Sequence, residues 1–261
     1  MENILHRPFY REFVWAYDLI ITGPISSRCD FIEGMLSQWG VLSGSSILDA
    51  GCGTGNYSVE LARKGYIVTG LDISAELISE AKKKSENKSL HLKFEVGDIL
   101  KLPFTQKFDG ILCRGVLNDI IDDTSRREVF FSFAHALRRS GVLIVDVREW
   151  NSTVIRKTKK PVFEKSVETD KGKLTFHSVT QLDNKTRRML VNERHAIKKD
   201  DEDLVFEYNF IMQCWAKEEL HNNLVNAGFG SIAYFGDYDR NIHIGSTDRI
   251  VAIASLKKVT D

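Results

Sequence analysis

Short apolar runs alternate with amphipathic, helix-length segments through the middle of the chain. Helices are expected between these runs, at residues 57–64, 74–84 and 124–138, with Ser74 as an N-cap. This alternation is typical of a parallel sheet covered by helices, in which ligands bind outside the carboxyl ends of the strands. The expected core strands are residues 46–50, 66–71, 90–96, 108–113 and 142–147.

A different pattern begins after Trp150, where β-rich runs follow one another with short polar turns between them, as in an antiparallel meander. In the last run, Phe206, Tyr208, Phe210 and Met212 line one face. That face needs a cover, which could be a lid, a partner subunit or one of the chain's own helices. The expected strands are residues 162–168, 173–182, 187–197 and 204–215, followed by a helix at 217–227 and strands at 231–235 and 249–256.

The sequence therefore predicts an α/β fold. The expected architecture is a Rossmann-like, doubly wound, mostly parallel seven-stranded sheet, with an antiparallel β insertion between the fifth strand and the last helix. Residues 1–150 should form an N-terminal cap helix, at the aromatic segment 10–21, and a ligand-binding core. Residues 151–215 should form the insertion, as a lid or dimer contact, and residues 216–261 should complete the core sheet.

Composition narrows the classes of partner. The 36 Lys and Arg residues balance 36 Asp and Glu residues, so the chain lacks the field that attracts nucleic acid or an anionic membrane. Its 4 cysteines and 7 histidines are scattered, so no metal site is expected, and reduced cysteines fit a cytoplasmic protein. We expect no cleavable signal and no membrane span.

Three alternating glycines follow the first predicted strand, in the segment DAGCGTG at residues 49–55. Glycines on a strand-to-helix turn let a ligand approach the backbone and the helix N-terminal amides. A dinucleotide-binding G-x-G-x-x-G loop would need glycine at position 56, where this chain has Asn56. Hydride transfer with a nicotinamide cofactor is therefore disfavoured.

Acidic residues close the next two predicted strands. Asp72, at the end of the second strand, lies where a carboxylate hydrogen-bonds a ribose diol, as adenosine-containing cofactors require. A Gly-Asp pair, Gly97 and Asp98, closes the third predicted strand. Together with Asp49 before the glycines, these positions point to an adenosine-containing ligand at the strand ends.

The segments ILDAGCGTGNYSVELA, VTGLDIS, VGDILKLPF and FDGILCRGVLN resemble the class I S-adenosylmethionine-dependent methyltransferases, strongly over residues 10–150 and loosely beyond. The resemblance implies that the glycine loop holds the methionine end of S-adenosylmethionine, that Asp72 holds its ribose, and that Asp98 and Ile99 border its adenine. It also implies that the last strand is antiparallel. The expected cofactor-binding residues are Trp15, Tyr17, Arg28, Asp49, Ala50, Gly51, Gly53, Gly55, Asp72, Ile73, Asp98, Ile99 and Cys113.

Within that family, the chain looks most similar to small-molecule N-methyltransferases of the glycine/sarcosine and sugar-amine types. The similarity rests on YREFVWAYD with Arg28 after it, on VDVREW, and on a β-rich insertion before WAKEELHNNLVNAGF. It implies that Trp15, Tyr17 and Arg28 close over the cofactor, and that Arg148 binds a substrate carboxylate. The expected substrate-binding residues are Arg114, Asn118 and Arg148.

The expected function is methyl transfer to a nitrogen or oxygen of a small-molecule acceptor, by in-line displacement with proximity and desolvation. The histidine that this family carries after the fourth strand is replaced by Leu117-Asn118-Asp119, so no catalytic residue is assigned. Asp119, Asp146 or a histidine are candidates for the base. The alternatives are a methyltransferase of tRNA or protein and a non-catalytic cofactor-binding protein. Two further alternatives concern structure: Arg148 could pair with a surface acid, and the chain could form a homodimer.

Overall fold

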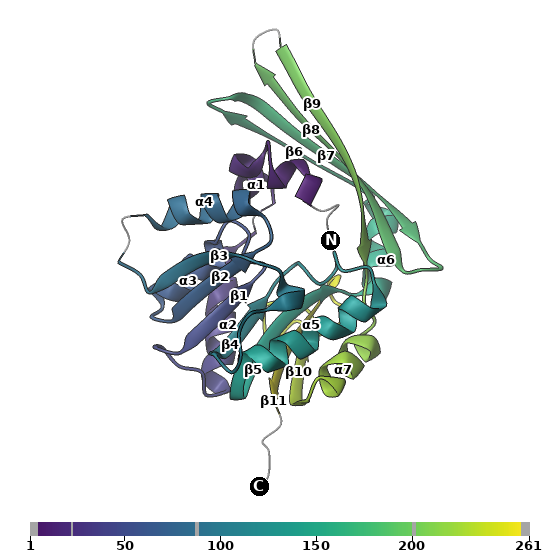
Figure 1. Ribbon diagram of the computed structural model, residues 1–261. Coiled ribbons are helices and arrows are strands. Elements are labelled where there is room, and N and C mark those ends of the chain that lie inside the picture. The colour runs from purple at the N-terminus through teal and green to yellow at the C-terminus, as the bar shows by residue number, and fades with distance from the viewer. Residues whose placement is uncertain (1–4, 22, 87–88, 200–201, 257–261) are drawn as a thin grey trace.

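The computed structural model describes residues 5–21, 23–86, 89–199 and 202–256. Seven strands form its central sheet, in the spatial order β10-β11-β5-β4-β1-β2-β3 (Figure 1). β11 is antiparallel to both of its neighbours, whereas the other core pairs are parallel, which confirms the predicted fold class and the reversed last strand. The strands are β1 (Ser46–Ala50), β2 (Ile67–Asp72), β3 (Leu92–Val96), β4 (Phe108–Cys113), β5 (Leu137–Arg148), β10 (Phe229–Phe235) and β11 (Arg249–Leu256).

Helices cover the central sheet with two separate apolar layers. α2 (Ile25–Gln38) and α3 (Asn56–Arg63) bury residues such as Ile32 and Leu61 in one layer. α5 (Asp123–Ala136) and α7 (Lys217–Asn226) bury Phe130, Phe133 and Leu220 in the other. α4 (Ala75–Ser85) packs against β2 and β3 and begins as predicted, because Ser74 Oγ accepts a hydrogen bond from Leu77 N at 3.1 Å.

A second sheet of four antiparallel strands rises above the core (Figure 1). A short helix, α6 (Trp150–Lys159), leads from the end of β5 into this sheet, and a bridge between Glu149 and Trp215 marks the return to the core. The predicted antiparallel insertion is therefore confirmed. Its strands are β6 (Val162–Thr169), β7 (Gly172–Asp183), β8 (Arg188–Lys199) and β9 (Glu202–Gln213).

The N-terminal segment, defined here as residues 5–21, covers the apolar inner face of the antiparallel sheet (Figure 1). Phe13 lies with its ring centroid 5.4 Å from that of Phe206. The expected single helix over residues 10–21 is wrong, because this segment contacts the sheet on one side and the core on the other, and its packing overrides local helix propensity. Its elements are η2 (Pro8–Tyr10), η3 (Val14–Ala16) and α1 (Tyr17–Ile20).

Two boundaries depart from the sequence prediction. The helix expected at 124–138 ends at Ala136, and β5 begins at once at Leu137 and turns through Ser140, which has a left-handed φ of 61°. The helices α2 and α6 were not predicted.

Within the described ranges, no helix has both the length and the apolar character that crossing a bilayer requires.

Two phenylalanines of α5 test the packing of the core. Phe133 is 0% exposed and Phe131 is 52% exposed on the same helix. We expect Phe133→Ala to lower the free energy of unfolding by ~3–5 kcal/mol, because a large buried ring leaves a cavity. Phe131→Ala is the matched control and should change it by less than about 1 kcal/mol. Urea denaturation of the two variants measures the difference, and equal losses would contradict the assigned burial.

Candidate functional site

The turn between β1 and α3 presents bare backbone at the carboxyl ends of the strands. Gly51, Gly53 and Gly55 have φ values of +78°, +55° and +76°, a left-handed conformation that side chains disfavour. A Cβ added at Gly53 would meet nothing within 4 Å, and the same holds at Gly115 after β4. The backbone at these two glycines is therefore open to close approach by a ligand.

Asp72, the last residue of β2, is hydrogen-bonded to the glycine turn. Its Oδ2 accepts from Gly53 N at 2.8 Å and its Oδ1 accepts from Ser74 N at 3.0 Å. Burial raises the pKa of this carboxyl, while these backbone N–H groups act to lower it. Each oxygen has a second lone pair, so Asp72 can still accept hydrogen bonds from a ligand.

The glycine turn is also tied to the N-terminal segment through Asp18. Asp18 Oδ1 accepts hydrogen bonds from Thr54 Oγ1 at 2.7 Å and from Asn56 Nδ2 at 2.8 Å. Lys84 of α4 forms an ion pair with the same carboxylate. The sequence analysis missed Asp18, since nothing in the local pattern shows that an acid of this segment meets a turn that lies 36 residues away.

Asp49 and Ala50 are the last two residues of β1, directly before the glycine turn, and both are buried. Ala50 is 0% exposed at the end of β1. Burial raises the pKa of Asp49 to about 6, although Ser58 Oγ donates a hydrogen bond to its Oδ2 at 2.6 Å and acts to lower it. Asp49, which precedes the glycine turn in β1, therefore anchors the first turn of α3.

Two of the predicted arginines meet beside the glycine turn. The Arg114 guanidinium, after β4, lies 4.0 Å from the ring centroid of Tyr57 and 5.4 Å from that of Tyr238. Arg28 of α2 lies 5.5 Å from the same Tyr238 ring and 3.9 Å from Asp237. Two cations from distant parts of the chain thus share one aromatic wall, and neither tyrosine was singled out by the sequence.

Asp146 of β5 is a fully partnered carboxylate. Its Oδ1 accepts from Gly115 N at 2.7 Å, and its Oδ2 accepts from Tyr238 Oη at 2.8 Å and pairs with Arg249. Burial acts to raise its pKa, but Arg249 and Arg114 outweigh burial and hold the pKa below its usual range. Asp146 is therefore a structural anion that positions the loop after β4.

Four further predicted residues lie around these groups, and a fifth, Trp15, lies apart from them. Asp98 Oδ1 accepts from Leu100 N at 2.9 Å and caps the turn η4 (Ile99–Lys101), with Ile99 in the core. Ile73 is half-buried next to Asp72, and Cys113 is buried at the end of β4. Trp15 packs instead against Phe13 and lies 4.6 Å below the Lys171 ammonium, at the antiparallel sheet. The structure does not bring Trp15 together with the glycine turn.

Asn118 and Arg148 join the ends of β4 and β5. Asn118 Oδ1 accepts from Arg148 N at 2.9 Å, and its main-chain carbonyl accepts from Gln213 N at 2.7 Å. The Arg148 guanidinium pairs with Asp248, which also pairs with Arg156. Arg148 thus has a carboxylate partner within the chain.

Arg7 and Glu193 lock the N-terminal segment to the inner face of the antiparallel sheet. Arg7 Nε donates to Glu193 Oε2 at 2.9 Å, and the Arg7 guanidinium lies over the rings of Tyr10 and Phe210. Glu193 is 2% exposed; burial acts to raise its pKa, but Arg7 holds the pKa below its usual range. This buried pair was not predicted, because its partners are 186 residues apart.

Asp119 lies where the N-terminal segment, the antiparallel sheet and the strand ends converge. Its Oδ1 is buried and makes no hydrogen bond to any residue that the structure describes. Burial raises the pKa of this carboxyl to about 7; Arg7 and Arg148 act to lower it, and Glu193 and Asp72 act to raise it. Asp119 therefore has one buried oxygen that no described residue hydrogen-bonds, in a region of mixed charge.

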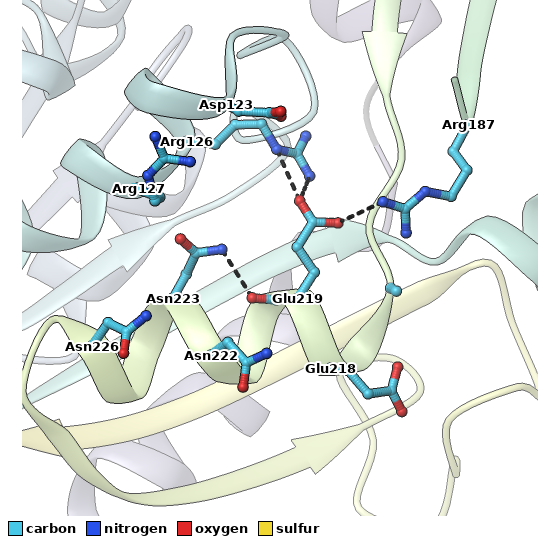
Figure 2. A pocket seen from close by; sticks show the side chains of 10 residues that line it. Asp123, Arg126, Arg127, Arg187, Glu218, Glu219, Asn222, Asn223 and Asn226 are labelled. Atoms are coloured by element: carbon cyan, nitrogen blue, oxygen red, sulfur yellow. Dashed lines mark hydrogen bonds and ion pairs between the residues drawn. The ribbon is translucent and has the colours of Figure 1, made fainter. Parts of the chain in front are cut away.

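A pocket of about 530 Å³ lies elsewhere, between the first turn of α5 and one side of α7. Figure 2 shows the Glu219 carboxylate between the guanidinium groups of Arg126 and Arg187, at 2.5 and 3.4 Å. Arg126 also lies 3.6 Å from the ring centroid of Trp215. This network joins α5, α7 and the β7–β8 turn, and the pocket shares no lining residue with the strand-end site.

Across the described ranges, no three His, Cys, Asp or Glu side chains are grouped so as to hold a metal ion.

The raised pKa of Asp119 predicts a pH-dependent stability. Its pKa of about 7 exceeds the value of ~3.9 in an unfolded chain, so stability from this group is present below pH ~4 and is lost as pH rises toward 7. We therefore expect Asp119→Asn to raise the free energy of unfolding at pH 8, on the order of 2 kcal/mol, with little effect at pH 4. Urea denaturation at the two pH values tests this, and a destabilised variant at pH 8 would contradict it.

Comparison with known proteins places the chain in a family. Residues 42–228 match the family described as "Methyltransferase domain". A protein of Geobacillus sp. strain WCH70 that is named as a methyltransferase is 31% identical over 141 residues, which cover 53% of this chain and 57% of that protein. The chain thus matches a little over half the length of this relative.

Solved structures extend the likeness to nearly the whole fold. An S-adenosylmethionine-dependent methyltransferase from Clostridium acetobutylicum superposes with a TM-score of 0.79, 22% identity and coverage of 95% of this chain and 98% of that chain. The sugar N-methyltransferase KedS8 from Streptoalloteichus superposes with a TM-score of 0.77, 14% identity and coverage of 95% and 92%. The chain belongs to the methyltransferase-domain family and has the fold of the S-adenosylmethionine-dependent methyltransferases.

Proposed function

We propose that this protein transfers a methyl group from S-adenosylmethionine to a nitrogen or oxygen of a small-molecule acceptor. The observation that carries the proposal is that the N-terminal segment lies across the strand ends. The N-terminal segment is bonded to the glycine turn through Asp18 and to the antiparallel sheet through the Arg7–Glu193 pair. A site covered in this way favours a small acceptor over tRNA or a protein chain, for which a basic face or an added module is expected.

The residues at the strand ends fit the cofactor. The open backbone at Gly53 and Gly115 suits close approach by its methionine part, and the free lone pairs of Asp72 suit its ribose hydroxyls. Arg28 and Arg114 would attract its carboxylate, and Asp98, Ile99 and Ile73 would border its adenine. When bound, the cofactor supplies a sulfonium methyl that is already activated.

The chain's own residues then have to align the acceptor and exclude water. Holding a correctly oriented nucleophile close to the methyl group can lower the activation free energy by ~7–11 kcal/mol. Exclusion of water strengthens the charge interactions inside the site. Tyr17 of the N-terminal segment lies close enough to Asp72 and Arg114 for their charges to affect its pKa, which burial raises. We assign Tyr17 to the wall that closes over the reacting groups.

An amine is the acceptor type that the similar structures support. KedS8 is described as a sugar N-methyltransferase, and CalS10 from Micromonospora as an amino pentose methyltransferase. Each of the two superposes over 95% of this chain. A polar amine of small size is therefore the first acceptor class to screen, ahead of tRNA and protein fractions.

Asp72→Ala tests the cofactor site. We expect at least a tenfold higher dissociation constant for S-adenosylmethionine by calorimetry, because the ribose hydroxyls lose their acceptor and the glycine turn loses its bond from Gly53 N. Glu168→Ala, an exposed position of β6, is the control and should leave the constant unchanged. An unaltered affinity in the Asp72 variant would remove this residue from the site.

Arg148→Leu tests the acceptor side. We expect unchanged affinity for S-adenosylmethionine and about tenfold slower transfer of radiolabelled methyl groups, because one hydrogen-bonded charge contributes ~1.5–3 kcal/mol. The assay uses a small-molecule extract of Geobacillus cells as the source of acceptor. Equal transfer by the variant would retire Arg148 as an acceptor contact and leave it as the partner of Asp248.

A further inference from the structure

Asp119 differs from three other carboxyls in or next to the strand-end site, Asp146, Asp72 and Glu193, in having an oxygen without a partner among the described residues. Asp146 is bonded to Gly115, Tyr238 and Arg249. Asp72 accepts two backbone N–H groups. Glu193 pairs with Arg7. In contrast, Asp119 Oδ1 is buried and makes no hydrogen bond within the described ranges. Since buried carboxylate oxygens are nearly always hydrogen-bonded, this orphan atom calls for a ligand donor.

The charges around Asp119 indicate the kind of donor. Its charged neighbours are Arg7, Arg148, Glu193 and Asp72, which come from four different parts of the chain. Both arginines already have carboxylate partners, because Arg7 pairs with Glu193 and Arg148 pairs with Asp248. Among the residues that the structure describes, neither Asp119 nor Asp72 forms an ion pair with a cationic side chain. A cationic group on the acceptor would balance this charge, and a neutral hydroxyl would not.

Aromatic side chains complete the surroundings of Asp119. Tyr10, Tyr17 and Tyr208 each lie within electrostatic range of its carboxyl, from η2, α1 and β9 respectively. Tyr10 and Tyr17 have ring centroids 6.4 Å apart. Aromatic rings attract an ammonium group through the electrostatics of their faces, as well as excluding water. The surroundings therefore suit an ammonium group better than a neutral acceptor.

The other base candidates are paired or out of reach. The Nε2 of His195 lies 3.4 Å from Glu193, and its Nδ1 is buried without a hydrogen bond among the described residues. The ring is 0% exposed and is enclosed by the rings of Phe9, Phe13 and Phe176, so no path for an acceptor leads to it. Asp146 is held as an anion by its partners. Among the bases considered from the sequence, Asp119 combines burial with an unused oxygen.

We propose that Asp119 binds the ammonium group of an amine acceptor through its unpartnered Oδ1 and removes the proton that blocks attack. This inference rests on the proposed methyl transfer and deepens it by naming the acceptor class and the base. One N–H bond of the ammonium breaks, and its proton passes to the carboxylate. The nitrogen lone pair then forms the N–C bond at the expense of the methyl–sulfur bond, whose electron pair remains on sulfur.

The pH dependence has a defined sign. A base must be deprotonated to act, and burial raises the pKa of Asp119 to about 7 against the lowering influence of Arg7 and Arg148. The rate at saturating cofactor should therefore rise with pH through an acid limb near pH 7. A carboxyl of ordinary pKa would be fully ionised there and would show no such limb.

Asp119→Asn is the test, with Asp123→Asn as a matched control, since Asp123 is an exposed carboxyl on the neighbouring helix. The measurement is radiolabelled methyl transfer into the Geobacillus extract at saturating S-adenosylmethionine. It covers roughly pH 5.5 to 9, a range that brackets the expected acid limb. We expect the Asp119 variant to be about 100-fold slower and to lose the limb near pH 7. Its dissociation constant for S-adenosylmethionine should stay within about twofold of the parent value, and the control should match the parent.

Blocking the amines of the extract identifies the acceptor class. Treatment with N-hydroxysuccinimidyl acetate acylates amines and spares alcohols under mild conditions, so incorporation should fall to background. Incorporation that survives the treatment, or an Asp119 variant that keeps the parent rate and acid limb, would overturn the inference. No incorporation by a parent enzyme that binds S-adenosylmethionine would overturn the proposed function and this inference together.

Discussion

Burial of the inner face of β6–β9 by the N-terminal segment is the contact on which the site depends. The face carries Phe176 and Phe206, which would be exposed without Phe9 and Phe13. Burying one such ring contributes ~1.5–3 kcal/mol, so the segment is held in place by apolar area rather than by its short helical turns. Held there, it spans from the antiparallel sheet to the glycine turn, across the strand ends.

The buried carboxyls of the site differ in how many donors reach them. Asp146 has a donor for each oxygen. It fixes the loop after β4 through Gly115 and accepts a hydrogen bond from Tyr238, whose ring lies beside Arg28 and Arg114. Asp119 has the same side chain and the opposite environment, with an orphan oxygen and a pKa of about 7. Identical residues thus acquire different chemistry from the number of donors that reach them.

The elements that the sequence predicted best are those with a strong local signal. The core strands read as continuous apolar runs because parallel strands are buried on both faces, as in β5, where residues 142–145 are all 0% exposed. α6 escaped prediction because it is mostly polar, with Thr153 as its buried residue, and it is capped by Glu149. α2 carries Phe31, Ile32, Met35 and Leu36 at helical spacing, a signal that was present and not used.

The sequence by itself determined the α/β order, the antiparallel insertion and the glycine turn with its acids, because period, propensity and turn chemistry act over a few neighbouring residues. Which side chains meet was decided only by the tertiary structure. Asp18 reaches Thr54, Arg7 reaches Glu193, and no described residue donates to Asp119 Oδ1, because of contacts between segments far apart in the chain. Such contacts leave no local pattern, since they depend on how the two sheets and the N-terminal segment pack together.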